Sequence, residues 1–181
     1  ALLIRGKILL SQRKIAEATT ALENSVKSGP RSAEARYFLG IAYLQTRDFT
    51  KAERELVLAL RLNPAMAQAY LALAEVRLDT GDAEAAVRLA QQALALSPNA
   101  AEARLILGSA YASQQKYAEA APEIEAFVAG YPDNPAGHYR LGLLYLRQGR
   151  SDKAEQELET ALKYDPQNGE SLLALASVYV T

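Results

Sequence analysis

The chain of 181 residues has no cysteine and no tryptophan, and it has a single methionine and a single histidine. Without cysteine there can be no disulfide and no thiolate metal site, although the compartment stays open because periplasmic proteins can also lack cysteine. The lone His138 has no second histidine or cysteine with which to bind a metal. The chain also has no glycine-rich phosphate loop and no nucleophile elbow. We therefore expect no catalytic residue, no metal and no cofactor, and we expect His138 to be a buried structural residue in a protein that is not an enzyme.

The chain also has no large excess of positive or negative charge. The chain carries 20 basic and 21 acidic side chains, for a net charge of −1, and no basic stripe or polybasic segment stands out along it. We therefore expect neither a nucleic acid nor a membrane surface as partner. The longest apolar runs are far shorter than the roughly 20 residues of a transmembrane helix, so no direct membrane insertion is expected.

What the chain does contain is a repeat with a period of 34 residues. Proline recurs in this period at Pro30, Pro64, Pro98, Pro132 and Pro166. Alanine recurs in it at Ala18, Ala52, Ala86, Ala120 and Ala154. A column of small residues consists of Gly6, Gly40, Ala74, Gly108, Gly142 and Ala176, and a column rich in tyrosine contains Tyr43, Tyr111, Tyr145 and Tyr179. Columns that share one period predict a tandem array of one structural unit.

Each unit is predicted to form two helices. Between residues 33 and 66, apolar residues recur three and four positions apart in two stretches, which the polar turn 45–48 separates. Asp48 can cap the second helix, and Gly81 and Gly149 can end the first helix of their units in a left-handed conformation. The proline column ends each second helix. The glycine and alanine columns let two helices approach closely, and one hairpin alone cannot bury its apolar faces, so successive hairpins must stack.

These columns resemble the tetratricopeptide repeat. Unit 33–66 matches that family at Leu39, Gly40, Tyr43, Ala52, Leu56, Ala59 and Pro64, and unit 135–168 matches it at Leu141, Gly142, Tyr145, Ala154, Leu158, Ala161 and Pro166. The resemblance implies an all-α fold, a right-handed superhelical α-solenoid of antiparallel helix hairpins with about 11 helices. We expect a single array over residues 1–181, with repeats at approximately 1–32, 33–66, 67–100, 101–134 and 135–168 and a partial repeat at 169–181. Both ends look cut, so we expect the chain to be an excerpt of a longer protein.

Four residues depart from the regular repeat. Arg5 stands where leucine is expected, so we expect the first unit to be frayed or altered. Arg77 replaces the tyrosine of its column, and Phe127 replaces an alanine, where it needs extra room. Pro122 lies inside an expected second helix, where it removes one backbone hydrogen bond, and we expect it to be tolerated near the start of that helix.

Two further surfaces follow from the repeat. The last helix has no second helix after it, so we expect part of its apolar side to be bare and to be covered by another copy or by further chain: Leu172, Leu175 and Tyr179. Acidic residues of the second helices, Glu123 and Glu157 among them, are expected on a solvated convex face.

The resemblance implies that the first helix of each hairpin lines a concave groove. The residues predicted to bind a partner there are Tyr37, Ile41, Leu44, Leu71, Glu75, Leu78, Asp79, Leu105, Ser109, Tyr139, Arg140, Leu143 and Arg147. Glu75 and Asp79 form an acidic pair on this apolar floor, and Arg140 and Arg147 form a basic pair. The alternative is that the floor partly packs on itself. One subclass of the family holds C-terminal carboxylates of chaperones with lysine and asparagine at set positions of the first helices, and these are absent here, so a chaperone-tail receptor is not expected.

We therefore predict a protein–protein interaction module, an adaptor or scaffold that binds a peptide or partner segment in its concave groove. The partner is expected to be a protein or peptide that is apolar and carries a basic residue. Two alternatives stay open. One is a structural self-assembly or spacer element of a larger bacterial envelope or secretion complex, with a homo-oligomer formed through the exposed C-terminal helix, and the other is a regulatory segment of a larger enzyme. The alanine-rich composition suggests a bacterial protein of the cytoplasm or the periplasm.

Overall fold

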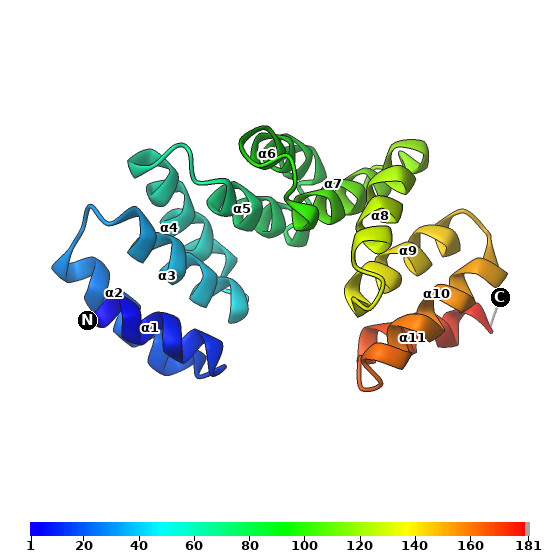
Figure 1. Ribbon diagram of the computed structural model, residues 1–181, viewed down its shortest axis with the longest axis horizontal. Helices are drawn as coiled ribbons and strands as arrows, with labels where there is room; N and C mark the ends of the chain where they lie inside the picture. Colours follow the sequence, from blue (N-terminus) through cyan, green and yellow to red (C-terminus); the bar gives the residue numbers. More distant parts are fainter. Residues whose placement is uncertain (180–181) are drawn as a thin grey trace. The chain divides into compact units, whose positions relative to one another are not determined.

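The computed structural model describes residues 1–179, and within them every regular element is an α-helix (Figure 1). The helices are α1 Leu2–Ser11, α2 Ile15–Ser28, α3 Ala33–Gln45, α4 Phe49–Leu62, α5 Ala67–Asp79, α6 Ala83–Leu96, α7 Ala101–Ser113, α8 Tyr117–Gly130, α9 Pro135–Arg147, α10 Ser151–Tyr164 and α11 Gly169–Val178. The all-α prediction is confirmed. Residues 180–181, which end the expected partial repeat, lie outside the described residues.

The helices pack as consecutive hairpins within two compact units, Ala1–Pro98 and Asn99–Thr181. In the first unit, α1 packs on α2, α3 on α4 and α5 on α6, and in the second unit α7 packs on α8 and α9 on α10. Within each unit, the second helix of a hairpin contacts the first helix of the next one, as α2 contacts α3 and α8 contacts α9. First helices also contact each other, α3 with α5 and α7 with α9. The expected single array and the limits of its repeats stay predictions.

The turns between the two helices of a hairpin have one geometry. The second residue after the first helix adopts a left-handed conformation at Arg13, Arg47, Gly81, Gln115 and Gly149, with φ between 57° and 86°. The next residue donates its N–H to a carbonyl five residues back, as Asp48 does to Tyr43 at 2.9 Å. This bond satisfies a carbonyl at the helix end, so the tight turn is a feature of the fold. The predicted left-handed glycines are confirmed, and so is the Asp48 cap, whose carboxylate accepts the Lys51 N–H.

The small-residue column marks where two helices meet most closely. A Cβ atom added to Gly40 would lie 2.7 Å from Cγ of Leu56, and one added to Gly142 would lie 2.7 Å from Cγ of Leu158. Both leucines are fully buried on the second helix of the same hairpin. The predicted close approach is therefore confirmed, and it explains why the column is restricted to glycine opposite a large side chain.

In the third hairpin, different residues form the close contact between the two helices. Ala74 stands in the small-residue column, and the 34-residue register places Ala90 where the other hairpins have leucine or isoleucine. Both alanines are completely buried. A methyl group on each helix thus replaces the combination of glycine with a branched side chain.

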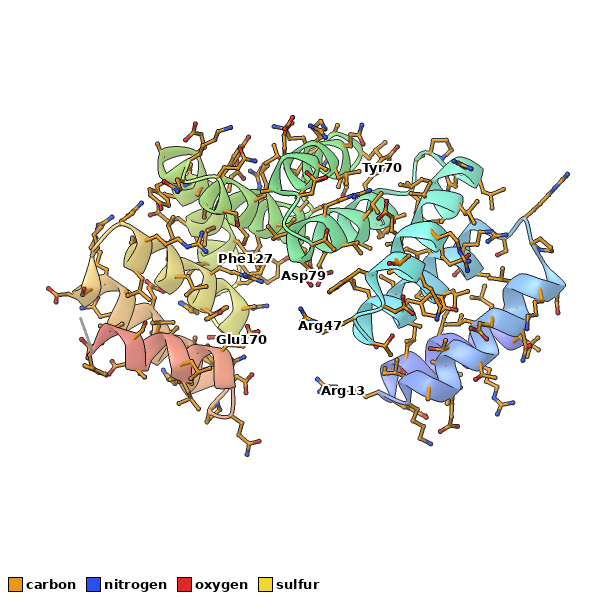
Figure 2. The ribbon with its side chains drawn as sticks, turned by 180° about the vertical axis from the view of Figure 1, so that it is seen from behind. Arg13, Arg47, Tyr70, Asp79, Phe127 and Glu170 are labelled. Atoms are coloured by element: carbon orange, nitrogen blue, oxygen red, sulfur yellow. The ribbon has the colours of Figure 1, made fainter. Side chains whose placement is uncertain are left out.

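The residues that depart from the repeat are accommodated by their neighbours. Gly137 supplies the extra room that Phe127 was expected to need, because a Cβ atom on this glycine would lie 2.8 Å from the Phe127 ring. The Phe127 ring, labelled in Figure 2, also stacks on Tyr131 at 5.2 Å between centroids. Arg77 donates to Glu53 of the preceding hairpin, as Tyr43 donates to Glu23 at 2.7 Å.

Pro122 lies inside α8, as expected. Of the three residues expected to be bare at the last helix, Leu172 is 49% exposed and Tyr179, which follows α11, is 64% exposed, whereas Leu175 is half-buried. None of the helices in residues 1–179 is both long enough and apolar enough to cross a bilayer.

Candidate partner-binding faces

The predicted groove residues form two faces, one in each unit. The unit 1 face lies on α3 and α5 and consists of Tyr37, Ile41, Leu44, Leu71, Glu75, Leu78 and Asp79. The unit 2 face lies on α7 and α9 and consists of Leu105, Ser109, Tyr139, Arg140, Leu143 and Arg147. Because α3 contacts α5 and α7 contacts α9, each face is a continuous surface of two neighbouring first helices.

The apolar part of the unit 1 face is half-buried. Tyr37, Ile41 and Leu44 pack against the core of this unit with one side, and each keeps part of its surface accessible. The Tyr37 ring meets Phe38 edge to face at 5.0 Å between centroids. The floor therefore packs partly on its own stack, as in the alternative left open by the sequence, and partly faces solvent.

An acidic edge borders this floor. Glu75 and Asp79 are exposed and lie one turn apart on α5, and Figure 2 shows Asp79 projecting outward from the end of that helix. Burial raises the pKa of Tyr37, and the negative charge of Glu75 raises it further. Glu75 on α5 is therefore close enough to act on the phenol of α3. An aromatic ring beside two carboxylates suits a cation.

The unit 2 face contains a small cavity, here called the α7–α9 cavity. Its volume is about 30 Å³, and it is lined by Ser109, Ala112, Ser113, Ile124, Arg140, Leu143, Leu144 and Arg147. Ile124 and Leu144 are almost completely buried and form its apolar base. The hydroxyl of Ser109 donates to the carbonyl of Leu105 at 2.8 Å, which directs this buried serine back to its own helix. Four of the predicted groove residues thus meet at one site.

Two arginines border this cavity. The guanidinium of Arg147 donates to the carbonyl of Ala112 on α7 at 3.0 Å, and the guanidinium of Arg140 lies 5.6 Å from the centroid of the Tyr139 ring. Burial raises the pKa of Tyr139, Glu170 raises it as well, and the two arginines act against them. The Tyr139 phenol therefore lies within the electrostatic reach of one carboxylate and two guanidinium groups.

Partly buried ion pairs between the two helices of a hairpin were not predicted. Arg36 donates to Glu55 at 2.7 Å and to the carbonyl of Pro30 at 3.0 Å. Arg104 donates to Glu123 at 2.9 Å. The cation stands at the fourth position of the unit and the glutamate 19 residues later, so this spacing is the signal that could have revealed the pairs.

His138 occupies the same place in the fifth hairpin. Its Nδ1 lies 2.7 Å from a carboxylate oxygen of Glu157, and its Nε2 lies 2.7 Å from the carbonyl of Pro132. Since both neighbours are acceptors, the ring satisfies both when each nitrogen carries a proton. The expected buried structural role of His138 is confirmed. The expectation that Glu123 and Glu157 belong to a solvated face is wrong, because both are partly buried, Glu123 as the partner of Arg104 and Glu157 as the partner of His138.

The two faces carry apolar, carboxylate and guanidinium groups. Residues 1–179 contain no group of three histidine, cysteine, aspartate or glutamate side chains placed to hold a metal ion. His138 is engaged by Glu157 and Pro132 within its hairpin. What the faces offer a partner is apolar surface, a carboxylate pair on one unit and a guanidinium pair on the other.

No curated protein sequence matches the chain. Solved structures do match, at sequence identities that support similarity of fold alone. A thermophilic tetratricopeptide repeat protein of Thermus thermophilus, TTC0263, is 23% identical with a TM-score of 0.83, and the match covers 99% of this chain and 98% of that one. The protein pilF of Pseudomonas aeruginosa is 20% identical with a TM-score of 0.78, and the match covers 99% of this chain and 83% of that one. YrrB, described as having an unusual peptide-binding site, is 22% identical with a TM-score of 0.68, and the match covers 96% of this chain and 89% of that one.

Family models give the more direct result. One tetratricopeptide repeat model matches residues 5–67, 47–87 and 71–135, and a second matches residues 111–179. The matches cover nearly the whole chain, and the helices and neighbours agree with an all-α solenoid of helix hairpins. The chain therefore belongs to the tetratricopeptide repeat family.

Proposed function

We propose that this protein is an adaptor or scaffold that holds a peptide or a partner segment on the first-helix faces of its hairpins. The tetratricopeptide repeat fold is that of a protein–protein interaction module. The observation that carries the more specific proposal is the composition of the two faces. Half-buried apolar side chains lie beside charged groups at their edges, which is the composition of a peptide-binding surface.

The proposed partner is a peptide segment with apolar side chains and at least one basic residue. The basic residue would meet Glu75 and Asp79 at the edge of the unit 1 face, where the Tyr37 ring adds an aromatic surface. Apolar side chains would cover Leu71 and Leu78, which the stack buries only in part. The proposal is supported by the similar protein YrrB, which is described as having an unusual peptide-binding site.

The test is selection of peptides from a displayed random library on the full chain, followed by affinity measurements. Tyr37→Ala, Leu71→Glu and Tyr139→Ala should each weaken binding of the selected peptides by about tenfold or more, because each removes or charges a central apolar contact. Matched controls on second helices are Leu96→Glu and Tyr164→Ala, which change exposed side chains away from both faces. If binding keeps its full strength in all three face variants, the assignment of the faces is wrong.

A second candidate function is self-assembly through α11. It is favoured by the exposed apolar side chains of this helix, of which Leu173 is 75% and Tyr179 64% exposed. A bare apolar surface of this kind associates in water. Light scattering over a range of concentrations should then show oligomers that Leu173→Glu converts to monomers. A monomer at every concentration rules this candidate out. The role of a regulatory segment in a larger enzyme stays a prediction.

A further inference from the structure

The two arginines at the α7–α9 cavity differ from Arg36 and Arg104 on other first helices. Arg36 and Arg104 each form an ion pair with a glutamate of their own hairpin, at 2.7 and 2.9 Å. Among residues 1–179, no ion pair includes Arg140 or Arg147. Arg140 is nevertheless half-buried. A guanidinium group that has lost part of its hydration and forms no ion pair provides a site for an anion.

The cavity between these arginines suits a small anionic group. Its volume of about 30 Å³ holds one small polar group. The hydrogen bond from Arg147 to Ala112 fixes one guanidinium at the rim. The base of buried Ile124 and Leu144 offers no polar partner, so the arginines decide which charge enters.

The corresponding place in unit 1 has the opposite charge. Asp79 stands 68 residues, or two repeat periods, before Arg147, and Glu75 stands at the same distance before Leu143. Both positions lie on the last turns of a first helix, α5 in one unit and α9 in the other. The same surface of the repeat is thus acidic in unit 1 and basic in unit 2, so the two faces select side chains of opposite charge.

We propose that the α7–α9 cavity binds the side-chain carboxylate of an aspartate or glutamate inside an apolar peptide segment. This inference rests on the proposed function, because it specifies what the unit 2 face recognises. The carboxylate accepts hydrogen bonds from Arg140 and Arg147, and apolar neighbours on both sides of the acidic residue pack on Leu105 and Leu143. An acidic residue within a segment supplies both neighbours, whereas a C-terminal carboxylate has chain on one side only.

The test uses nuclear magnetic resonance titrations of the full chain with four short peptides. The acidic peptide is Ac-Leu-Glu-Leu-NH₂, and Ac-Leu-Gln-Leu-NH₂ is its neutral counterpart. Ac-Leu-Gln-Leu-OH carries only a C-terminal carboxylate, and Ac-Leu-Lys-Leu-NH₂ carries a positive charge. The acidic peptide should shift the amide signals of α7 and α9 around Ser109 and Leu143, with an affinity about tenfold above that of the neutral peptide, because a hydrogen-bonded charge pair contributes about that factor.

Two variants and one control assign the effect to the arginines. Arg140→Met and Arg147→Met keep most of the side-chain stem and should bring the acidic peptide down to the affinity of the neutral one. Arg150→Met removes an exposed arginine that stacks on Tyr145 at 4.6 Å, outside the cavity lining, and should leave the difference intact. Thermal melts of all three variants establish that each is folded.

Several outcomes would overturn the inference. Equal affinities for the acidic and neutral peptides would do so, and so would signal shifts confined to other helices. If the peptide with the C-terminal carboxylate bound more strongly than the acidic peptide, the cavity would be a site for the C-terminal carboxylate of a chain. The proposed function fails separately, when Tyr37→Ala, Leu71→Glu and Tyr139→Ala leave the binding of library-selected peptides unchanged. A partner without an acidic residue can still bind the faces, so the two failures are distinguishable.

Discussion

Replacing Gly40 by alanine tests the close approach of helices on which the stack depends. The new methyl carbon would lie 2.7 Å from Cγ and 2.9 Å from Cδ2 of the buried Leu56. Overpacking of this kind costs about 1–3 kcal/mol, while alanine gains up to about 1 kcal/mol over glycine in a helix interior. We therefore expect Gly40→Ala to lower the free energy of unfolding by about 1 kcal/mol, whereas the same exchange on an exposed helix would raise it.

Leu56→Ala supplies the other half of the comparison. By itself it should cost about 2–5 kcal/mol, because it leaves a cavity beside Gly40. In the double variant, the two alanines reproduce the pair Ala74 and Ala90 of the third hairpin. The methyl group added at residue 40 no longer meets Leu56 and fills part of the cavity, so the double variant should be more stable than the sum of the single effects by at least about 1 kcal/mol.

The assay is urea denaturation of the four proteins, followed by circular dichroism, with free energies of unfolding compared at equal slopes. Ala74→Gly is the matched control, since it removes a methyl group in the hairpin where the opposing residue is already small. It should cost about 1 kcal/mol from helix propensity and about 1 kcal/mol more from the lost burial of the methyl group. An additive double variant, or a Gly40→Ala protein as stable as the parent, would show that the helices can separate freely, and the reasoning about the small-residue column would then be wrong.

Three further predictions concern single sites. Ser171 is only 1% exposed, and its hydroxyl has no hydrogen-bond partner among residues 1–179. Ser171→Ala should therefore raise the free energy of unfolding by about 1 kcal/mol in urea denaturation, and a loss of stability would contradict this. Gly137→Ala should lower the melting temperature, because its methyl carbon meets the Phe127 ring at 2.8 Å, and the loss should shrink when Phe127 is also replaced by leucine. Burial, and then the hydrogen bond to Glu23, raises the pKa of Tyr43 well above its usual range. The stability that this shift provides is complete below about pH 10 and declines as the pH rises further, so thermal melts should show a smaller alkaline loss for Tyr43→Phe than for the parent.

The repeat made most of the fold predictable. Proline, alanine and small residues in phase specified where helices end and where they approach each other, and the structure places Gly40 against Leu56 accordingly. Asp48 was predictable as a cap, because its chemistry acts on a backbone N–H only three residues away. Local patterns of this kind depend on the chain near each residue, and the period carries them from one hairpin to the next.

The sequence predicted which helices form the candidate site, but it did not predict which polar groups meet there. The register placed Ser109 and Leu143 on first-helix faces, but it did not show that Ser109 is buried at a cavity with Leu143 at its wall. The pairing of His138 with Glu157 was also missed, since a glutamate on a second helix is ordinarily a solvated residue.

By itself, the sequence determined that this chain is a series of helical hairpins, which helix faces are apolar, and which residues must be small. Periodic side chains fix these properties, because a helix repeats its faces every few residues and a unit repeats its neighbours every 34. Only the tertiary structure decided which polar groups meet. The guanidinium of Arg147 reaches the carbonyl of Ala112, 35 residues earlier, and this contact shapes the α7–α9 cavity. Such meetings depend on the distance and angle between packed helices, which are set by the volumes of all the side chains between them.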